Sequence, residues 1–288
     1  MKISSPLYHT TGLSQIGRLV KQEKMSRSIG IHNALGSSGV AIGTISLTFF
    51  MTTLGWRSVY LFWAIPVLAW GFIILRSSQF KTTILERKES ARKTGGARLS
   101  RILTFSFILF LVVIGLRETG ITGIQTFMTT YLVQVRGLSE ATSSLIFGLG
   151  PAIGAIGALG GGYIGEKSGP KKSLSLWILG CALSLFILSL TPQLYFLSIV
   201  YLVYAFFSHG VWTPMNTIVS EMAPRTERGL SFSVYFFIDN LVAALAPVLA
   251  ATVIEASSIS YIFPFSLVLI VASLILLQFF SLPKHPLR

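Results

Sequence analysis

Charged residues are scarce in this chain, and acidic residues are the scarcest. Of 288 residues, 11% are charged, ten are acidic, and Asp239 is the only aspartate. A soluble domain carries about 25% charged residues. The hydrophobic residues, at 52% of the chain, are more than one core can hold, so lipid is the expected solvent for much of the molecule.

Metal ligands and nucleotide motifs are missing as well. The single cysteine, Cys181, lies inside an apolar run, which excludes a disulfide framework and suits a small buried or lipid-facing side chain. The sequence has no cluster of Cys and His at ligand spacing and no G-x-x-x-x-G-K-[ST] loop. We therefore expect no metal site, no cofactor, no ATP-driven step and no enzymatic activity.

Long apolar runs are what the chain has in abundance. A transmembrane helix needs about 20 largely apolar residues, and eight segments have that character. A weaker one, Ile3–Val20, looks like the end of another helix. The sequence thus predicts an all-α polytopic membrane protein. The eight expected spans are Ile29–Leu54, Val59–Leu75, Leu103–Val133, Ser143–Ile164, Ser173–Leu190, Tyr195–Glu221, Leu230–Ile254 and Tyr261–Leu282.

The basic residues lie mostly in every second loop. Nineteen of the 23 Lys and Arg residues fall on one side, whereas the other side holds only Arg57 and Arg136. Cytoplasmic loops carry such an excess, so the linker and the C-terminus are expected in the cytoplasm and the protein in the cell membrane. The net charge of +13 is then a topology signal, and nucleic acid is not an expected partner.

A shift of 204 residues aligns the chain with itself. It places Val20–Lys24 on Pro224–Arg228, two basic turns that contain Glu, and Gly43 on Pro247. Parallel repeats of six-helix halves are a common transporter construction. We expect residues 1–75 to be the remainder of the first half, 76–101 a cytoplasmic linker and 102–288 the second half. Under this shift the chain begins inside the fourth helix, so three and a half helices of the repeat would precede residue 1.

The turn Gly162–Lys172 joins two of the spans and has a distinctive pattern. It resembles the cytoplasmic signature G-x-x-x-D/E-R/K-x-G-x-R/K-R/K of the major facilitator superfamily, with Glu166 in the acidic position. The region from Tyr8-His9 to Gly30-Ile31-His32 resembles helices 4 and 5 of small-molecule efflux members of that family. The resemblance implies a fold running from late helix 4 to helix 12.

In the resembled family such turns latch the cytoplasmic gate against helix 11. The resemblance implies that Glu166 meets Arg228 or the helix start at Gly229, where the positive end of the helix dipole favours an anion. The alternative is a basic turn that only sets topology. The predicted gate residues are Gly162, Glu166, Lys167, Gly169, Lys171, Lys172 and Arg228.

Polar residues recur at helical spacing on two spans. Glu118, Thr122 and Gln125 share one face beside Arg117, and His209, Thr213 and Asn216 share another. Intramembrane charges normally face protein or water because lipid exposure is costly. We predict that these residues and Asp239 line a substrate and proton pathway. The alternatives are an Arg117–Glu118 structural pair, hydrogen bonds between helices, and a packing role for Asp239. Neighbouring residues point about 100° apart on a helix, so separate partners are expected for Arg117 and Glu118.

Two glycine stripes are expected to pack helices closely. Gly36, Gly39 and Gly43, with His32, line the span that the resemblance makes helix 5. The other stripe, on helix 8, is Gly150, Gly154, Gly157 and Gly161. Because the resembled family packs helices 5 and 8 across the two halves, we predict that the stripes face each other there. The alternative is packing within each half.

Together these patterns predict a secondary transporter of a small organic solute, working by alternating access and proton-coupled efflux. Its expected partners are the lipid bilayer, a small-molecule substrate and protons, and it is expected to be a monomer. The alternatives are proton-linked uptake of a sugar or organic anion, an inactive truncated fragment, and a non-transporting membrane protein.

Overall fold

The computed structural model describes residues 4–76, 99–224 and 227–282. Within these ranges the chain forms helices and short 3-10 turns, without a strand. Helices satisfy every backbone N–H and C=O inside a bilayer, so the apolar runs have this structure. The helices are α1 Ser4–Leu19, α2 Met25–Thr53, α3 Trp56–Arg76, α5 Leu99–Ile102, α6 Phe105–Gln134, α7 Glu140–Ser168, α8 Pro170–Leu190, α9 Leu194–Gly210, α10 Trp212–Met222, α11 Arg228–Ala256 and α12 Ile262–Phe279.

The predicted all-α membrane fold is confirmed, with one difference in the count of spans. Seven stretches are long and apolar enough to cross a membrane, and α9 with α10 counts as one of them. The helix α2 has the length, with 29 residues, but is not among the seven. Its serines, glycines, His32 and Asn33 lower its hydropathy. The predicted linker lies largely outside the described residues.

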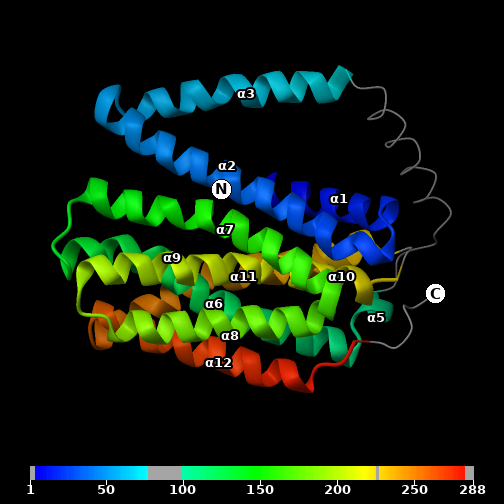
Figure 1. The fold of residues 1–288 in the computed structure, drawn as a ribbon. Coiled ribbons are helices and arrows are strands. Elements are labelled where there is room, and N and C mark those ends of the chain that lie inside the picture. The colour runs from blue at the N-terminus through cyan, green and yellow to red at the C-terminus, as the bar shows by residue number, and fades with distance from the viewer. Residues whose placement is uncertain (1–3, 77–98, 225–226, 283–288) are drawn as a thin grey trace.

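Helices α6 to α12 form a bundle of six spanning elements (Figure 1). Within it α7 packs against α9, α6 against α11 and α12, and α8 against α9 and α12. The side chains of Phe110, Leu185 and Ile270 are fully buried between these helices. This bundle lies in the part of the chain, residues 102–288, that the repeat predicts to be the second half.

The helix of the span between residues 194 and 222 is interrupted in its middle, next to Pro214. The helix α9 ends at Gly210, Val211 forms a turn, and α10 begins at Trp212. Proline has no N–H and clashes with the carbonyl four residues earlier, which here is Gly210. The bend therefore separates the buried polar residues at the end of α9 from those of α10.

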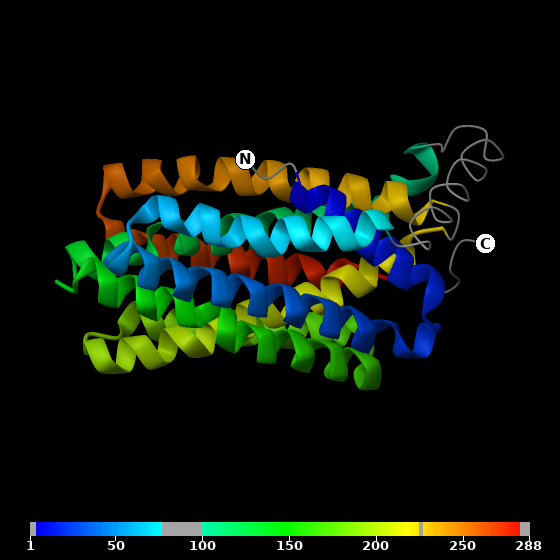
Figure 2. The ribbon, with the colours of Figure 1, turned by 90° about the horizontal axis from the view of Figure 1, so that it is seen from above.

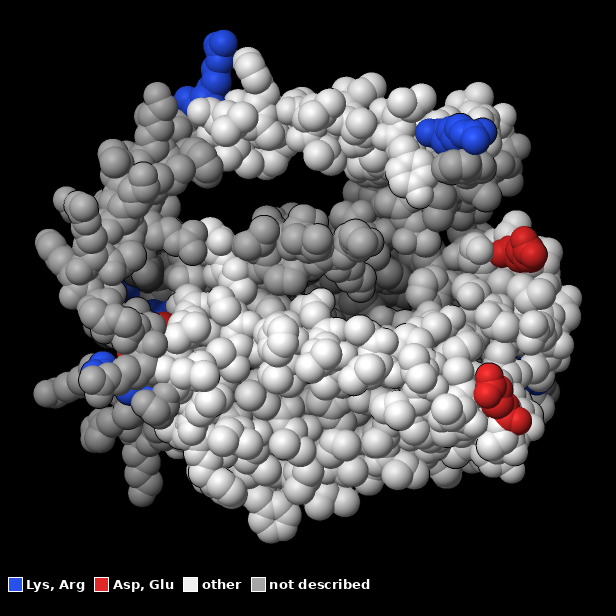
Figure 3. Space-filling model, turned by 180° about the vertical axis from the view of Figure 1, so that it is seen from behind, with Lys and Arg blue, Asp and Glu red and all other residues white. Residues whose placement is uncertain are grey.

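Helices α1 and α2 lie against this bundle, whereas α3 stands apart from it (Figure 1) and lies over the other helices in the view from above (Figure 2). The helix α1 contacts α11, and α2 runs antiparallel along α7. In contrast, no part of the apolar window of α3 is buried; α3 contacts α2, and a wide opening lies beneath much of its length (Figure 3).

The element bounds agree with the internal repeat. A shift of 204 residues moves Met25–Thr53 to 229–257, within one residue of α11. The same shift moves Trp56–Arg76 to 260–280, which matches the span Ile259–Phe279. Thus α2 and α11 are counterparts, and so are α3 and α12.

The charged residues gather at the two ends of the helices, with an uncharged surface between them (Figure 3). One end, which we call the basic end, carries Arg76, Arg101, Arg228 and the α7–α8 turn with its lysines. The opposite end carries Arg57 and Arg136. This separation is typical of a protein whose middle lies in lipid.

Candidate transport pathway and gate

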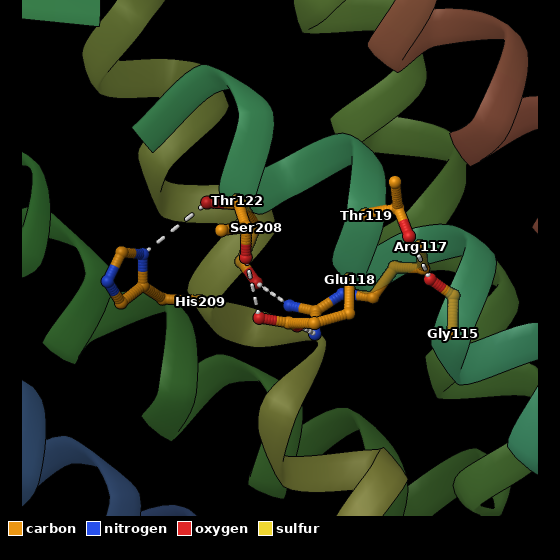
Figure 4. A network of polar contacts seen from close by, with 7 residues as sticks. All are labelled: Gly115, Arg117, Glu118, Thr119, Thr122, Ser208 and His209. Carbon is orange, nitrogen blue, oxygen red and sulfur yellow. Dashed lines mark hydrogen bonds and ion pairs between the residues drawn. The ribbon is translucent and has the colours of Figure 1, made fainter. Parts of the chain in front are cut away.

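A buried ion pair lies inside the C-terminal bundle, where α6 faces α9 (Figure 4). The Arg117 Nη1 and Glu118 Oε2 atoms are 2.7 Å apart, and both residues are at most 5% exposed. The expectation that these neighbours take separate partners is wrong. The side chain of Arg117 is long enough to turn back across the 100° between them. Removing either partner would leave an uncompensated buried charge.

Further contacts hold this pair in place. The second guanidinium nitrogen of Arg117 donates to the Ser208 carbonyl at 3.1 Å, and the guanidinium lies 5.2 Å from the centre of the Trp212 ring. The Thr122 hydroxyl donates to Glu118 Oε1 at 3.0 Å. The pair thus ties α6 to the bend between α9 and α10.

The remaining residues of the predicted α6 face differ in their environment. Thr122 is half-buried and Gln125 is exposed, so the face runs from the bundle core to its surface. On α11, Asp239 is 4% exposed and lies one helical turn from the buried Tyr235. Arg117 and Asp239 form no ion pair with each other. The buried charged residues of this bundle are Arg117, Glu118 and Asp239 within the spans and Glu227 and Arg228 at the start of α11.

The polar residues of α9 and α10 serve helix contacts. His209 Nδ1 lies 3.0 Å from the Ala205 carbonyl of its own helix, and the ring packs against Gly154 of α7. The Thr213 hydroxyl donates to the Ala158 carbonyl of α7 at 2.9 Å. The Thr213 bond agrees with the alternative of hydrogen bonds between helices, whereas the His209 contact lies within α9.

Asn216 contacts the N-terminal part of the molecule. Its amide nitrogen lies 3.5 Å from Asn33 Oδ1, and the Asn33 amide donates to the Thr213 hydroxyl at 3.4 Å. Sequence reasoning missed Asn33 because it considered only the neighbouring His32 and the glycines. An amide within a span, four residues after its expected start at Ile29, was the available signal.

The predicted facing of the two glycine stripes is wrong, although the helices that carry them do pack together. A Cβ atom at Gly157 would collide with the Phe206 carbonyl of α9, and one at Gly161 with the Gly210 carbonyl at the bend. Gly150 and Gly154 likewise face Tyr201 and His209 of α9. The α7 stripe therefore packs within the C-terminal bundle.

The other stripe has no such contact. Cβ atoms at Gly36, Gly39 and Gly43 would meet nothing within 4 Å, and His32 lies against α1, with its ring centre 6.1 Å from that of His9. Each of the two helices has small residues on two of its faces. Hydropathy does not show which of these faces contacts the other helix, so the stripes can lie on different faces.

The contact of α2 with α7 uses a second set of small residues. The Gly30 and Gly162 backbones approach closely, with a Cβ at Gly30 lying 3.1 Å from Gly162 Cα. A Cβ at Gly165 would collide with the Ser26 hydroxyl, and one at Gly148 would lie 3.0 Å from Thr44 Cγ2. The two helices are therefore in contact from the basic end to near the opposite end.

The α7–α8 turn meets α2, where Gly165 lies against Ser26. Glu166 is exposed, and Glu166 and Arg228 form no ion pair, so the expected latch between them is wrong. The residue at the start of α11, Gly229, instead faces Ser14 of α1. The internal repeat explains this: the turn after α7 lies by α2, which is the counterpart of α11.

The other residues of the predicted gate have separate contacts. Arg228 donates through Nη1 to the Gly17 carbonyl, which joins the end of α1 to the start of α11. Lys171 donates to the Gln278 and Phe280 carbonyls at 3.1 and 2.6 Å, and so caps α12. Lys167 lies over the Tyr163 ring, and Lys172 is exposed. Gly169 has φ of 85°, which glycine permits, and reverses the chain between α7 and α8.

A polytopic helical membrane protein with two repeat-related parts is thus defined by the fold. The Major Facilitator Superfamily model matches residues 1–194 and 155–288, and the chain belongs to this family. The chain is 25% identical over 244 residues to a candidate metabolite transport protein of Haemophilus influenzae. That alignment covers 78% of this chain and 58% of the relative, so the chain spans less than two thirds of its length.

Two solved structures have the same fold. The human organic anion transporter MFSD10 (TETRAN) has a TM-score of 0.72 and 16% identity, covering 93% of this chain and 67% of that one. The proton:xylose symporter XylE, bound to 6-bromo-6-deoxy-D-glucose, has a TM-score of 0.71 and 16% identity, covering 94% and 67%. At this identity the likeness concerns the fold.

Proposed function

We propose that this chain is part of a secondary transporter that moves a small organic solute by alternating access, coupled to protons. The observation that carries the proposal is the set of charges inside the C-terminal bundle. Arg117, Glu118 and Asp239 are all at most 5% exposed there. Charged groups this deep in a membrane are costly, and in transport proteins they mark ion pathways.

The preferred proton carrier is the buried acid outside the ion pair. Glu118 lies 2.7 Å from Arg117, whereas Asp239 is a second acid that is 4% exposed on α11. Acids buried inside membrane proteins mark proton pathways. Asp239 is therefore the preferred carrier, and Glu118 with Arg117 the neighbouring group whose pairing changes when Asp239 binds a proton.

Contacts between the two parts of the molecule support alternating access. Arg228 with Gly17 and Asn33 with Asn216 are polar contacts between the two parts. Rocking of one part against the other around a midplane site is the usual transporter motion. These contacts would open when the basic end opens.

The direction of transport is proposed as export, on the resemblance of the helix 4–5 region to efflux members. Proton-linked uptake is the second candidate, because a solved structure of this fold is titled a proton:xylose symporter. Export and uptake are distinguished by the direction across the membrane of the solute gradient that drives proton movement.

The test uses the chain reconstituted into liposomes that contain a pH-sensitive dye, with a panel of sugars, organic anions and organic cations added in turn. A solute that is transported should move protons. The Asp239→Asn variant should abolish this proton movement, and Glu118→Gln should reduce it at least tenfold. Glu255→Gln, which changes an exposed acid at the end of α11, should leave it unchanged.

Unchanged proton movement in both Asp239→Asn and Glu118→Gln would contradict the carrier assignment. Solute movement without protons in the unaltered chain would leave a transporter but remove proton coupling. No movement of any solute would favour a non-transporting membrane protein or an inactive fragment.

A further inference from the structure

A groove on the membrane-facing surface lies between α8 and α12, near the basic end. It has a volume of about 470 Å³ and is lined by Ser175, Leu176, Leu179, Leu274, Ile275 and Gln278. The two helices lie side by side in Figure 1 and pack against each other. Most of its wall is leucine and isoleucine, and Leu176, Leu179 and Ile275 are 44 to 55% exposed.

The polar residues of the groove are at the end that faces the membrane surface. Ser175 and Gln278 belong to the first turns of α8 and the last turn of α12. The leucines and Ile275 lie deeper along the same helices. The groove thus changes from polar to apolar along its length, in the direction from headgroup to acyl chain in one lipid leaflet.

Two lysines stand at this polar end. Lys171 and Lys172 lie one helical turn before Ser175 and Leu176 on the same face of α8. The Lys171 ammonium donates to the Gln278 and Phe280 carbonyls, so it is held at the mouth of the groove. Lys172 is exposed.

The charge at the mouth is not balanced by the described carboxylates. Neither lysine forms an ion pair with a described acid, and Glu166, the acid of the same turn, is exposed without one. The first turn of α8 contains no acidic residue, and its helix dipole adds positive potential. Basic pockets between transmembrane helices at the cytoplasmic side suit anionic headgroups.

We propose that the α8–α12 groove binds one anionic phospholipid, with its phosphate at Lys172 and Lys171 and one acyl chain along Leu176, Leu179 and Ile275. The lipid would join the end of α12 to the start of α8, beside the turn that contacts α2. This site does not depend on the proposed transport function, because it lies on the outside of the bundle.

The test is native mass spectrometry of the purified full chain after addition of dioleoylphosphatidylglycerol or dioleoylphosphatidylcholine. One phosphatidylglycerol should stay bound at concentrations where phosphatidylcholine is lost. Lys172→Gln should weaken phosphatidylglycerol binding at least fivefold. Ile275→Trp, which fills the groove, should weaken binding of both lipids.

The matched control is Lys167→Gln, which removes an equal charge from the same turn but from a lysine held over Tyr163. Equal losses for Lys167→Gln and Lys172→Gln would overturn the site, because they would show attraction by general charge. Equal retention of both lipids by the unaltered chain would also overturn it. Thermal unfolding in lipid-free detergent should be the same for the two lysine variants, which separates lipid loss from misfolding.

Discussion

The helices α3 and α12 are counterparts in the internal repeat, yet their environments are opposite. A third of the apolar window of α12 is buried, and none of that of α3. The helix α12 packs against α6 and α8, whereas α3 packs mainly against α2. Both are strongly apolar, so composition did not cause the difference. Burial in a membrane protein depends on the neighbours that a helix has, because lipid accepts apolar surface as readily as a core does.

The largest expected effect comes from one matched pair of positions in these helices. Leu277 of α12 is fully buried, and its repeat counterpart in α3, Ile73, is 56% exposed. Leu277→Ala should lower the free energy of unfolding by about 2–5 kcal/mol, because it leaves a cavity. Ile73→Ala should change it by less than about 0.5 kcal/mol. Thermal and denaturant unfolding in detergent measure both, and similar losses would show that α3 is packed in solution.

A second, smaller contrast concerns the two glycine stripes. Gly157→Ala should cost about 1–3 kcal/mol of stability, because the new methyl group meets the rigid Phe206 carbonyl. Gly39→Ala should be neutral or stabilise by up to about 1 kcal/mol, since nothing lies near it and alanine reduces the freedom of the unfolded chain. Unfolding of the two single variants compares them directly. A destabilising Gly39→Ala would reveal a contact on the outer face of α2.

The smallest expected effect lies where the two parts of the molecule meet. Asn33→Ala and Asn216→Ala should each lose little stability, and their coupling energy should be about 0.6 kcal/mol, the usual value for a side-chain hydrogen bond between membrane helices. A double-mutant cycle on unfolding measures it. A coupling energy near zero would mean that the 3.5 Å contact does not hold the two parts together. The Arg228–Gly17 hydrogen bond and the packing of α2 on α7 would then hold them together.

Much of the fold follows from the sequence. The spans and the repeat offset of 204 residues both appear in the helix bounds. Both depend on local properties: run length, and similar hydropathy at a constant spacing. The signature around Gly162 and Glu166 likewise indicated the family, because a short turn between spans has few acceptable sequences.

The site was only partly predictable. The polar residues of α6 and α10 could be named as candidates, since intramembrane polar side chains stand out against an apolar background. Their partners were not: Arg117 pairs with its own neighbour, and Glu166 leaves Arg228 to the Gly17 carbonyl. Asn33 was missed, although it contacts two predicted residues across the molecule.

The sequence by itself determined that this protein is an α-helical membrane protein of one family, with its basic end distinct from the other. Those properties come from transfer of side chains and backbone between water and lipid, which each segment undergoes independently. Tertiary structure alone decided which small face of α7 meets α9 and which meets α2, and that Lys171 caps α12. Helical periodicity defines the faces of a helix, but the choice of neighbour for each face depends on close packing between segments far apart in the chain.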